Sequence, residues 1–94
     1  MTVMIIGGDH LGSISNSLKE KGYDKIKHYP GRKKFPVNKM ISGGLDLLLV
    51  LTDYVGTDLS RTVKTEAKKN GVRVAFAKRS WSSIARELER IQRS

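Results

Sequence analysis

Cysteine is missing from this chain of 94 residues, and its absence excludes several kinds of chemistry. Without thiols there is no disulfide framework, no thiolate metal site and no cysteine nucleophile. Chains that do without disulfides are typical of reducing compartments, so we expect a cytoplasmic protein.

Long hydrophobic runs are missing too. The first apolar stretch, Val3–Ile6, is short and lacks a positively charged lead. A secretion signal needs a run of about 7–15 apolar residues, and a membrane helix needs about 20. We therefore interpret Val3–Ile6 as the first strand and expect no membrane association.

Acidic residues are scarce. The chain has 9 Asp and Glu against 18 Lys and Arg, a net charge of +9, and from Asp58 onward ten cations oppose four carboxylates. A basic surface draws phosphate by long-range attraction and by counterion release, so this excess favours a polyanion or a phosphorylated ligand. The alternative is a protein that is basic without such a partner.

The length fits one domain, residues 1–94, with no linker or repeat. A domain of this size buries only roughly 60 to 68% of the surface that its unfolded chain exposes. Its stability is therefore modest, and pairing with a second copy would cover apolar surface and sheet edges. We expect a homodimer.

The centre of the chain is Leu47–Leu51, a continuous apolar run between two glycines and a polar turn. Such runs are typical of strands buried on both faces, as in parallel sheets covered by helices. Residues 58–70 follow with helical spacing, Gly71 stops this helix, and residues 72–77 form a second apolar run. Together they predict one β-α-β unit.

The flanking segments supply the remaining elements. Residues 11–21 have helical spacing and Gly22 ends them, while residues 25–28 form a short edge strand. A loop from residue 29 to residue 44 would be unusually long, so we expect a short helix at Val37–Ser42.

Two helix starts are predicted from capping residues. Thr57 or Asp58 is expected at the N-cap of the helix after the central strand, and Ser80 at the N-cap of the last helix. Trp81 is then predicted to face the core, and the opposite side of the last helix carries Arg86, Arg90 and Arg93.

Strands that alternate with helices predict an α/β fold, because right-handed crossovers join parallel strands. We predict a small doubly wound, four-stranded parallel sheet of the Rossmann or flavodoxin type, in the order 2-1-3-4, with helices on both faces. A ligand would bind outside the carboxyl ends of the strands, where the turns after all four strands meet.

The first of these turns is rich in glycine. Gly7 and Gly8 precede a helix, where backbone N–H groups could approach an anion, and the alternative is simply a tight strand-to-helix turn. The G-x-G-x-x-G and G-x-x-x-x-G-K-[ST] patterns are both absent, so neither dinucleotide nor P-loop chemistry is predicted.

The second turn falls in the most basic window of the chain, residues 29–36. Arg32, Lys33 and Lys34 lie between Tyr29 and Phe35. Consecutive cations beside aromatic rings are typical of nucleic-acid surfaces. The alternative is a solvated loop, because prolines and a glycine mark this window as irregular.

Charged residues follow the last two strands. Asp53 lies just beyond the central strand, where ligands of α/β proteins bind, and its alternative role is to form the turn. Lys78, Arg79 and Ser80 precede the last helix and would place two cations beside free backbone N–H groups.

Catalytic chemistry has little support. Histidines and carboxylates in the turns could ligate a metal or act as a base and its orienting group, but H-x-x-x-H, H-E-x-x-H and G-x-S-x-G patterns are absent. We assign no catalytic residue, metal or cofactor. The predicted ligand site consists of Gly7, Gly8, Asp9, His10, His28, Arg32, Lys33, Lys34, Asp53, Lys78, Arg79 and Ser80, with a secondary basic face of Arg61, Lys64 and Lys68.

A set of ordered segments spans nearly the full chain: Ile5–His10, Ile26–His28, Gly31, Arg32, Asp46–Asp53, Val63, Lys64, Ala67–Lys69 and Ala77–Ser80. In these segments the chain resembles a family of small bacterial proteins classed as a domain of unknown function, family 2325. The resemblance implies a minimal Rossmann-type domain and carries no established activity. Many members have a histidine shortly after a Thr-Asp pair, where this chain has Thr57, so a metal or acid–base role does not carry over.

These observations predict a non-enzymatic module that binds phosphate groups. The preferred ligand is nucleic acid, bound with little discrimination between bases. The alternative is a protein or enzyme that binds a nucleotide or another phosphorylated metabolite in the same crevice. A homodimeric structural or regulatory protein is a third, compatible hypothesis.

Overall fold

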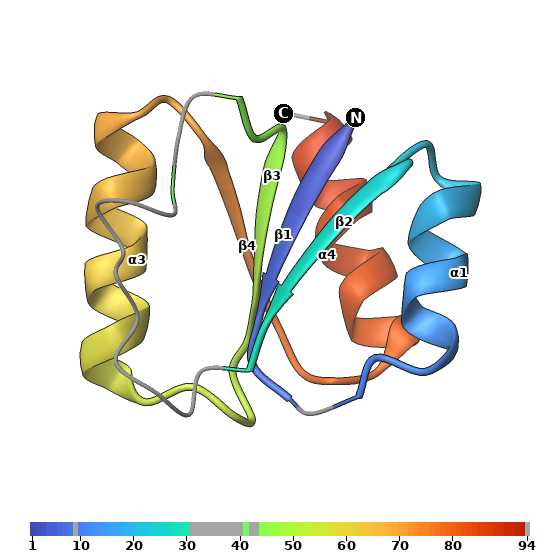
Figure 1. Cartoon of the computed structure of the whole chain (residues 1–94), viewed down its shortest axis with the longest axis horizontal. Coiled ribbons are helices and arrows are strands. Elements are labelled where there is room, and N and C mark those ends of the chain that lie inside the picture. Colours follow the sequence, from blue (N-terminus) through green and yellow to red (C-terminus); the bar gives the residue numbers. More distant parts are fainter. Residues whose placement is uncertain (9, 31–40, 42–43, 94) are drawn as a thin grey trace.

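Four strands form the middle layer of the protein. The computed structural model describes residues 1–8, 10–30, 41 and 44–93. Asp9, the Arg32–Lys34 cations and the expected Val37–Ser42 helix lie outside these residues, except for Ile41, which is buried. All strand pairs are parallel and the order is β2-β1-β3-β4, as predicted (Figure 1). The strands are β1 (Thr2–Ile6), β2 (Lys25–Tyr29), β3 (Leu47–Leu51) and β4 (Arg73–Ala77).

The central strand β3 is buried along its whole length, as its continuous apolar sequence predicts. Alternate side chains of a strand point to opposite faces, so this strand supplies both halves of the core. Leu47, Leu49 and Leu51 belong to one buried cluster, and Leu48 and Val50 belong to the other.

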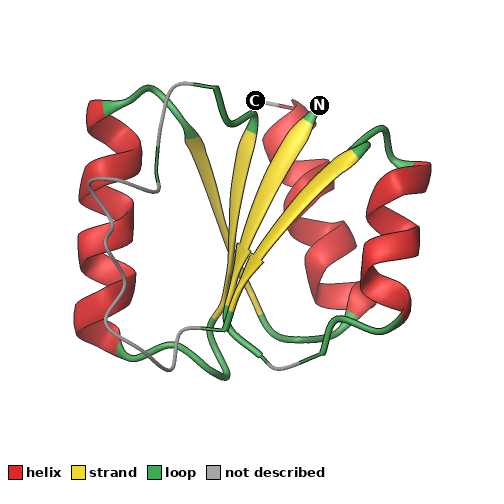
Figure 2. Ribbon diagram, viewed as in Figure 1, coloured by secondary structure: helices red, strands yellow, loops and turns green. Residues whose placement is uncertain are grey.

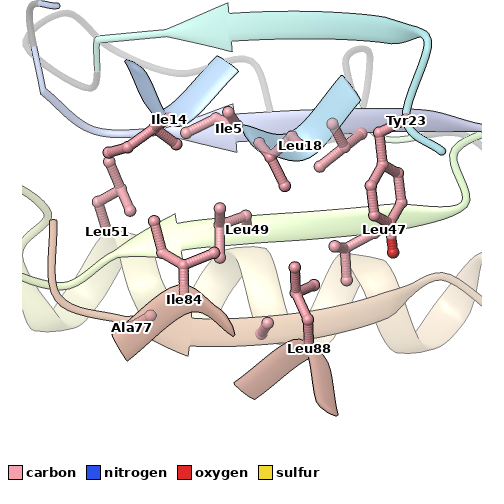
Figure 3. Packing of buried hydrophobic residues seen from close by; sticks show 12 residues of the cluster. Ile5, Ile14, Leu18, Tyr23, Leu47, Leu49, Leu51, Ala77, Ile84 and Leu88 are labelled. Atoms are coloured by element: carbon pink, nitrogen blue, oxygen red, sulfur yellow. The ribbon is translucent and has the colours of Figure 1, made fainter. Parts of the chain in front are cut away.

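Helices cover both faces of the sheet (Figure 2). Ile14 and Leu18 of α1 and Ile84 and Leu88 of α4 pack with Leu49 in one cluster (Figure 3). Val63 and Ala67 of α3 pack in the other. Among the described residues the helices are α1 (Ser13–Glu20), α3 (Thr57–Lys69) and α4 (Trp81–Arg93).

The C-terminal ends of α1 and α3 follow local sequence signals. In α1 the N–H of Tyr23 donates to the carbonyl of Leu18 at 3.1 Å across Gly22, and in α3 the N–H of Val72 donates to that of Ala67 at 2.9 Å across Gly71. Both are Schellman ends, which favour glycine because it accepts a positive φ. Both predicted glycine stops are therefore confirmed.

Of the two predicted helix starts, one is confirmed and the other was wrong. Ser80 caps α4 as predicted, because its Oγ accepts a hydrogen bond from the N–H of Ser83 at 3.3 Å. The prediction for α3 was wrong: Gly56, in an extended conformation, holds the N-cap without a side-chain hydrogen bond, and Thr57 is already helical. No helix in the described part of the chain combines the length and apolar character needed to cross a bilayer.

Candidate functional site

The carboxyl ends of all four strands lie along one edge of the sheet, the lower edge in Figure 1. The turns that follow β1, β3 and β4 start there and lead into α1, α3 and α4. This edge is where ligands of doubly wound proteins bind, because the turns on either side of the reversal in strand order lead to opposite faces and leave a crevice between them. Most residues of the predicted site lie in these turns.

Gly7 joins the first turn to its neighbours. Its φ is +112°, and a Cβ atom there would lie 3.0 Å from Val55 Cγ2 and 3.1 Å from the carbonyl oxygen of Leu51. Its N–H donates to the carbonyl of Tyr29 at 2.8 Å, and its own carbonyl lies 3.0 Å from His28 Nε2. The N–H and the carbonyl of Gly7 thus already have partners within the chain, which favours the tight-turn alternative for this glycine.

Arg79 ties three turns together. Its guanidinium donates from Nε to the carbonyl of His10 at 3.0 Å and also from Nη2 to the same oxygen. Its backbone N–H donates to Asp53 Oδ2 at 3.2 Å. Asp53 therefore lies at the predicted edge and braces the neighbouring turn rather than only its own, and its role toward a ligand stays a prediction.

Lys78 and Arg79 have different neighbours, although they are adjacent in the chain. Lys78 lines an open pocket of about 320 Å³ at the end of β4, beside the first turns of α4. The same pocket is also lined by Arg86 and Ser83 of α4 and by Thr52 directly after β3. The sequence placed Arg86 on the outer face of its helix but did not connect it with Lys78.

The positive charges of Lys78 and Arg86 are not paired with the carboxylate that shares their pocket. Glu87 also lines it, but this carboxylate pairs with Arg90, whose Nη2 lies 2.7 Å from Glu87 Oε2. Lys78 and Arg86 are exposed and form no ion pair with any residue that the structure describes. Two cations beside two hydroxyl groups form a surface suited to phosphate oxygens.

The secondary basic face lies on α3, which covers the other side of the sheet. Arg61, Lys64 and Lys68 are all exposed there, and within the described ranges none of them forms an ion pair. Lys69 differs, because its Nζ lies 3.5 Å from Glu66 Oε1. The predicted stripe is therefore a row of free positive charge.

Tyr54 is a site residue that the sequence analysis passed over. Its side chain is 52% exposed, and its Cδ2 lies 3.7 Å from the position that a Cβ on Gly8 would take. The same position lies 3.8 Å from Arg79 Nε. The available signal was a bulky aromatic residue in the polar turn directly after the central strand.

The two histidines do not build a shared centre. His28 is half-buried against Gly7, while His10 is exposed and its carbonyl holds Arg79. Nowhere in the described ranges do three or more histidine, aspartate or glutamate side chains gather in a way that could hold a metal.

A parallel four-stranded sheet with its order reversed between β1 and β3, and with helices on both faces, defines a small doubly wound α/β protein of the Rossmann or flavodoxin type. The chain belongs to the family described as "Uncharacterized protein conserved in bacteria (DUF2325)", whose family model matches residues 2–91. This confirms the resemblance seen in the sequence. No curated protein and no solved structure matches the chain.

Proposed function

We propose that this protein is a non-enzymatic module that binds the phosphate groups of nucleic acid. The observation that carries the proposal is the pair of unneutralised cations, Lys78 and Arg86, in the open pocket beside the carboxyl end of β4. An Arg guanidinium can donate two parallel hydrogen bonds to one phosphate, and a Lys ammonium adds a mobile point charge. The hydroxyl group of Ser83 can supply a further donor, whereas that of Thr52 already donates to the carbonyl of Ala77 at 3.4 Å.

An extended polyanion suits the distribution of charge better than a small ligand does. Free cations lie both in the pocket of Lys78 and Arg86 and on the α3 face of Arg61, Lys64 and Lys68. A mononucleotide would reach only one of them, whereas a strand carries a phosphate every few ångströms. Each phosphate that is neutralised releases a counterion, so several contacts together yield useful affinity.

The test is fluorescence anisotropy of a labelled oligonucleotide across a salt series. The site variant combines Lys78→Ala with Arg86→Ala. The control variant combines Lys19→Ala with Lys21→Ala, two exposed lysines at the end of α1 away from the strand carboxyl ends. Both variants lower the net charge by the same amount, so only the position of the removed charge differs.

We expect binding that weakens steeply with salt. The slope of log affinity against log salt should shrink by about one for each phosphate contact removed in the site variant, and it should hardly change in the control. A slope near zero in the wild type would remove the proposal. Equal weakening in both variants would assign binding to general charge rather than to this pocket.

A further inference from the structure

The ring of Tyr54 is held in an exposed position. The other aromatic residues that the structure describes are buried or half-buried. The N–H of Tyr54 donates to the carbonyl of Leu51 at 3.0 Å, which closes its turn onto β3. The next residue, Val55, lies against Gly7. The backbone that carries the ring is therefore fixed on both sides while the ring itself meets solvent.

Gly8 leaves the space beside this ring open. It has a φ of +80°, a conformation that other residues rarely adopt. A Cβ atom there would approach both the Tyr54 ring, at 3.7 Å, and the Arg79 side chain, at 3.8 Å. The ring and the guanidinium thus flank the bare backbone of Gly8, and no side chain of this residue fills the space between them.

Hydrogen bonds fix the orientation of the Arg79 guanidinium but occupy only some of its donors. Its two hydrogen bonds to the carbonyl of His10 come from Nε and Nη2. Its Nη1 donates no hydrogen bond to the described part of the chain. A guanidinium anchored in this way presents donors in a fixed direction, because its planar fork cannot rotate freely.

From this geometry we propose that Tyr54 and Arg79 form a subsite for one unpaired nucleotide of single-stranded nucleic acid. The base stacks on the exposed ring, and the adjoining phosphate accepts hydrogen bonds from Arg79 Nη1. This inference rests on the proposed function and narrows its ligand. A base inside a duplex is stacked between its neighbours and offers no free face, whereas an unpaired base does.

The test compares three labelled probes: a thymidine strand, a strand of the same length made of abasic sites, and a duplex. The thymidine and abasic strands carry the same phosphates, so they differ only in the bases. Each probe is titrated with the wild type, with Tyr54→Ala and with Tyr54→Phe. Because Tyr54 is exposed, both variants should keep the wild-type urea midpoint.

We expect the wild type to bind the thymidine strand roughly tenfold more tightly than the abasic strand. Tyr54→Ala should lose this preference and bind the abasic strand and the duplex as the wild type does. Tyr54→Phe keeps the ring and should keep the preference. Equal wild-type affinity for both strands, or a Tyr54→Ala variant that retains the preference, would overturn the subsite.

The two proposals fail in different ways. Salt-dependent binding of the abasic strand and the duplex without a base preference leaves the phosphate-binding function in place and removes the subsite. Absence of binding to all three probes at low salt removes both.

Discussion

Gly7 is a position where single atoms decide whether the turns can pack. An alanine there would combine a strained backbone with a Cβ 3.1 Å from the carbonyl oxygen of Leu51, which β3 holds in place. We expect Gly7→Ala to lower the free energy of unfolding by about 3 kcal/mol, as the sum of strain and overpacking. Urea denaturation measures this loss.

Gly71 provides the matched control for Gly7. Its φ is +69°, but no atom lies within 4 Å of an added Cβ. Gly71→Ala therefore reports the backbone strain alone, about 1 kcal/mol. Equal losses at the two positions would show that the contact with Leu51 and Val55 does not matter.

Tyr23 makes the stability depend on pH in alkaline solution. Burial raises the pKa of its hydroxyl, the nearby Asp46 raises it further, and Arg73 opposes the shift. The folded state thus holds the proton more tightly than the unfolded state. The resulting stabilisation is complete below the unfolded pKa of about 10 and is lost as the pH rises through the folded pKa.

Tyr23→Phe isolates this effect. We expect the urea midpoint of the wild type to fall more steeply above about pH 10 than that of the variant, which has no hydroxyl to ionise. Other groups also titrate there, so the difference between the two proteins is the quantity to compare. Parallel declines would contradict the assignment to Tyr23.

At the scale of elements, Ser80 links the stability of α4 to the candidate site. Ser80→Ala removes the oxygen that accepts from the Ser83 N–H and should cost about 1 kcal/mol in urea unfolding. Ser80→Asp keeps a capping oxygen and should restore that stability, but its negative charge would weaken oligonucleotide binding. A Ser80→Asp protein that loses both stability and oligonucleotide binding, or keeps both, would contradict this separation of the two roles.

The elements themselves follow closely from local sequence. β3 has the predicted bounds, Leu47–Leu51, because a fully apolar run between turn residues has few other solutions. The N-cap of α3 was misjudged because Thr57 and Gly56 both suit that position locally. The path of the preceding turn decides between them, and this path depends on packing against Gly7.

For the whole molecule, the charge of +9 should weaken the folded state through self-repulsion. Salt screens this repulsion, so we expect the urea midpoint to rise as sodium chloride increases from about 0.01 M to 0.15 M. Combining Lys64→Glu with Lys68→Glu removes two exposed cations and should flatten the rise. A midpoint that falls with salt would show that attractive pairs dominate instead.

The expected homodimer and cytoplasmic location stay predictions. β2 and β4 are the edge strands of the sheet, so the feature that suggested pairing is present in the described part of the chain.

The sequence by itself determined the strands and the glycine ends of α1 and α3, because apolar periodicity and φ preferences act locally. The strand order was predicted from the crossover rules of alternating α/β chains. Tertiary structure alone decided three pairings. Lys78 shares a pocket with Arg86, Arg79 donates to the carbonyl of His10, and Tyr54 lies beside Gly8. The members of the last two pairs are distant in the chain. Their contacts depend on how each turn leaves its strand, and no short stretch of sequence encodes that path.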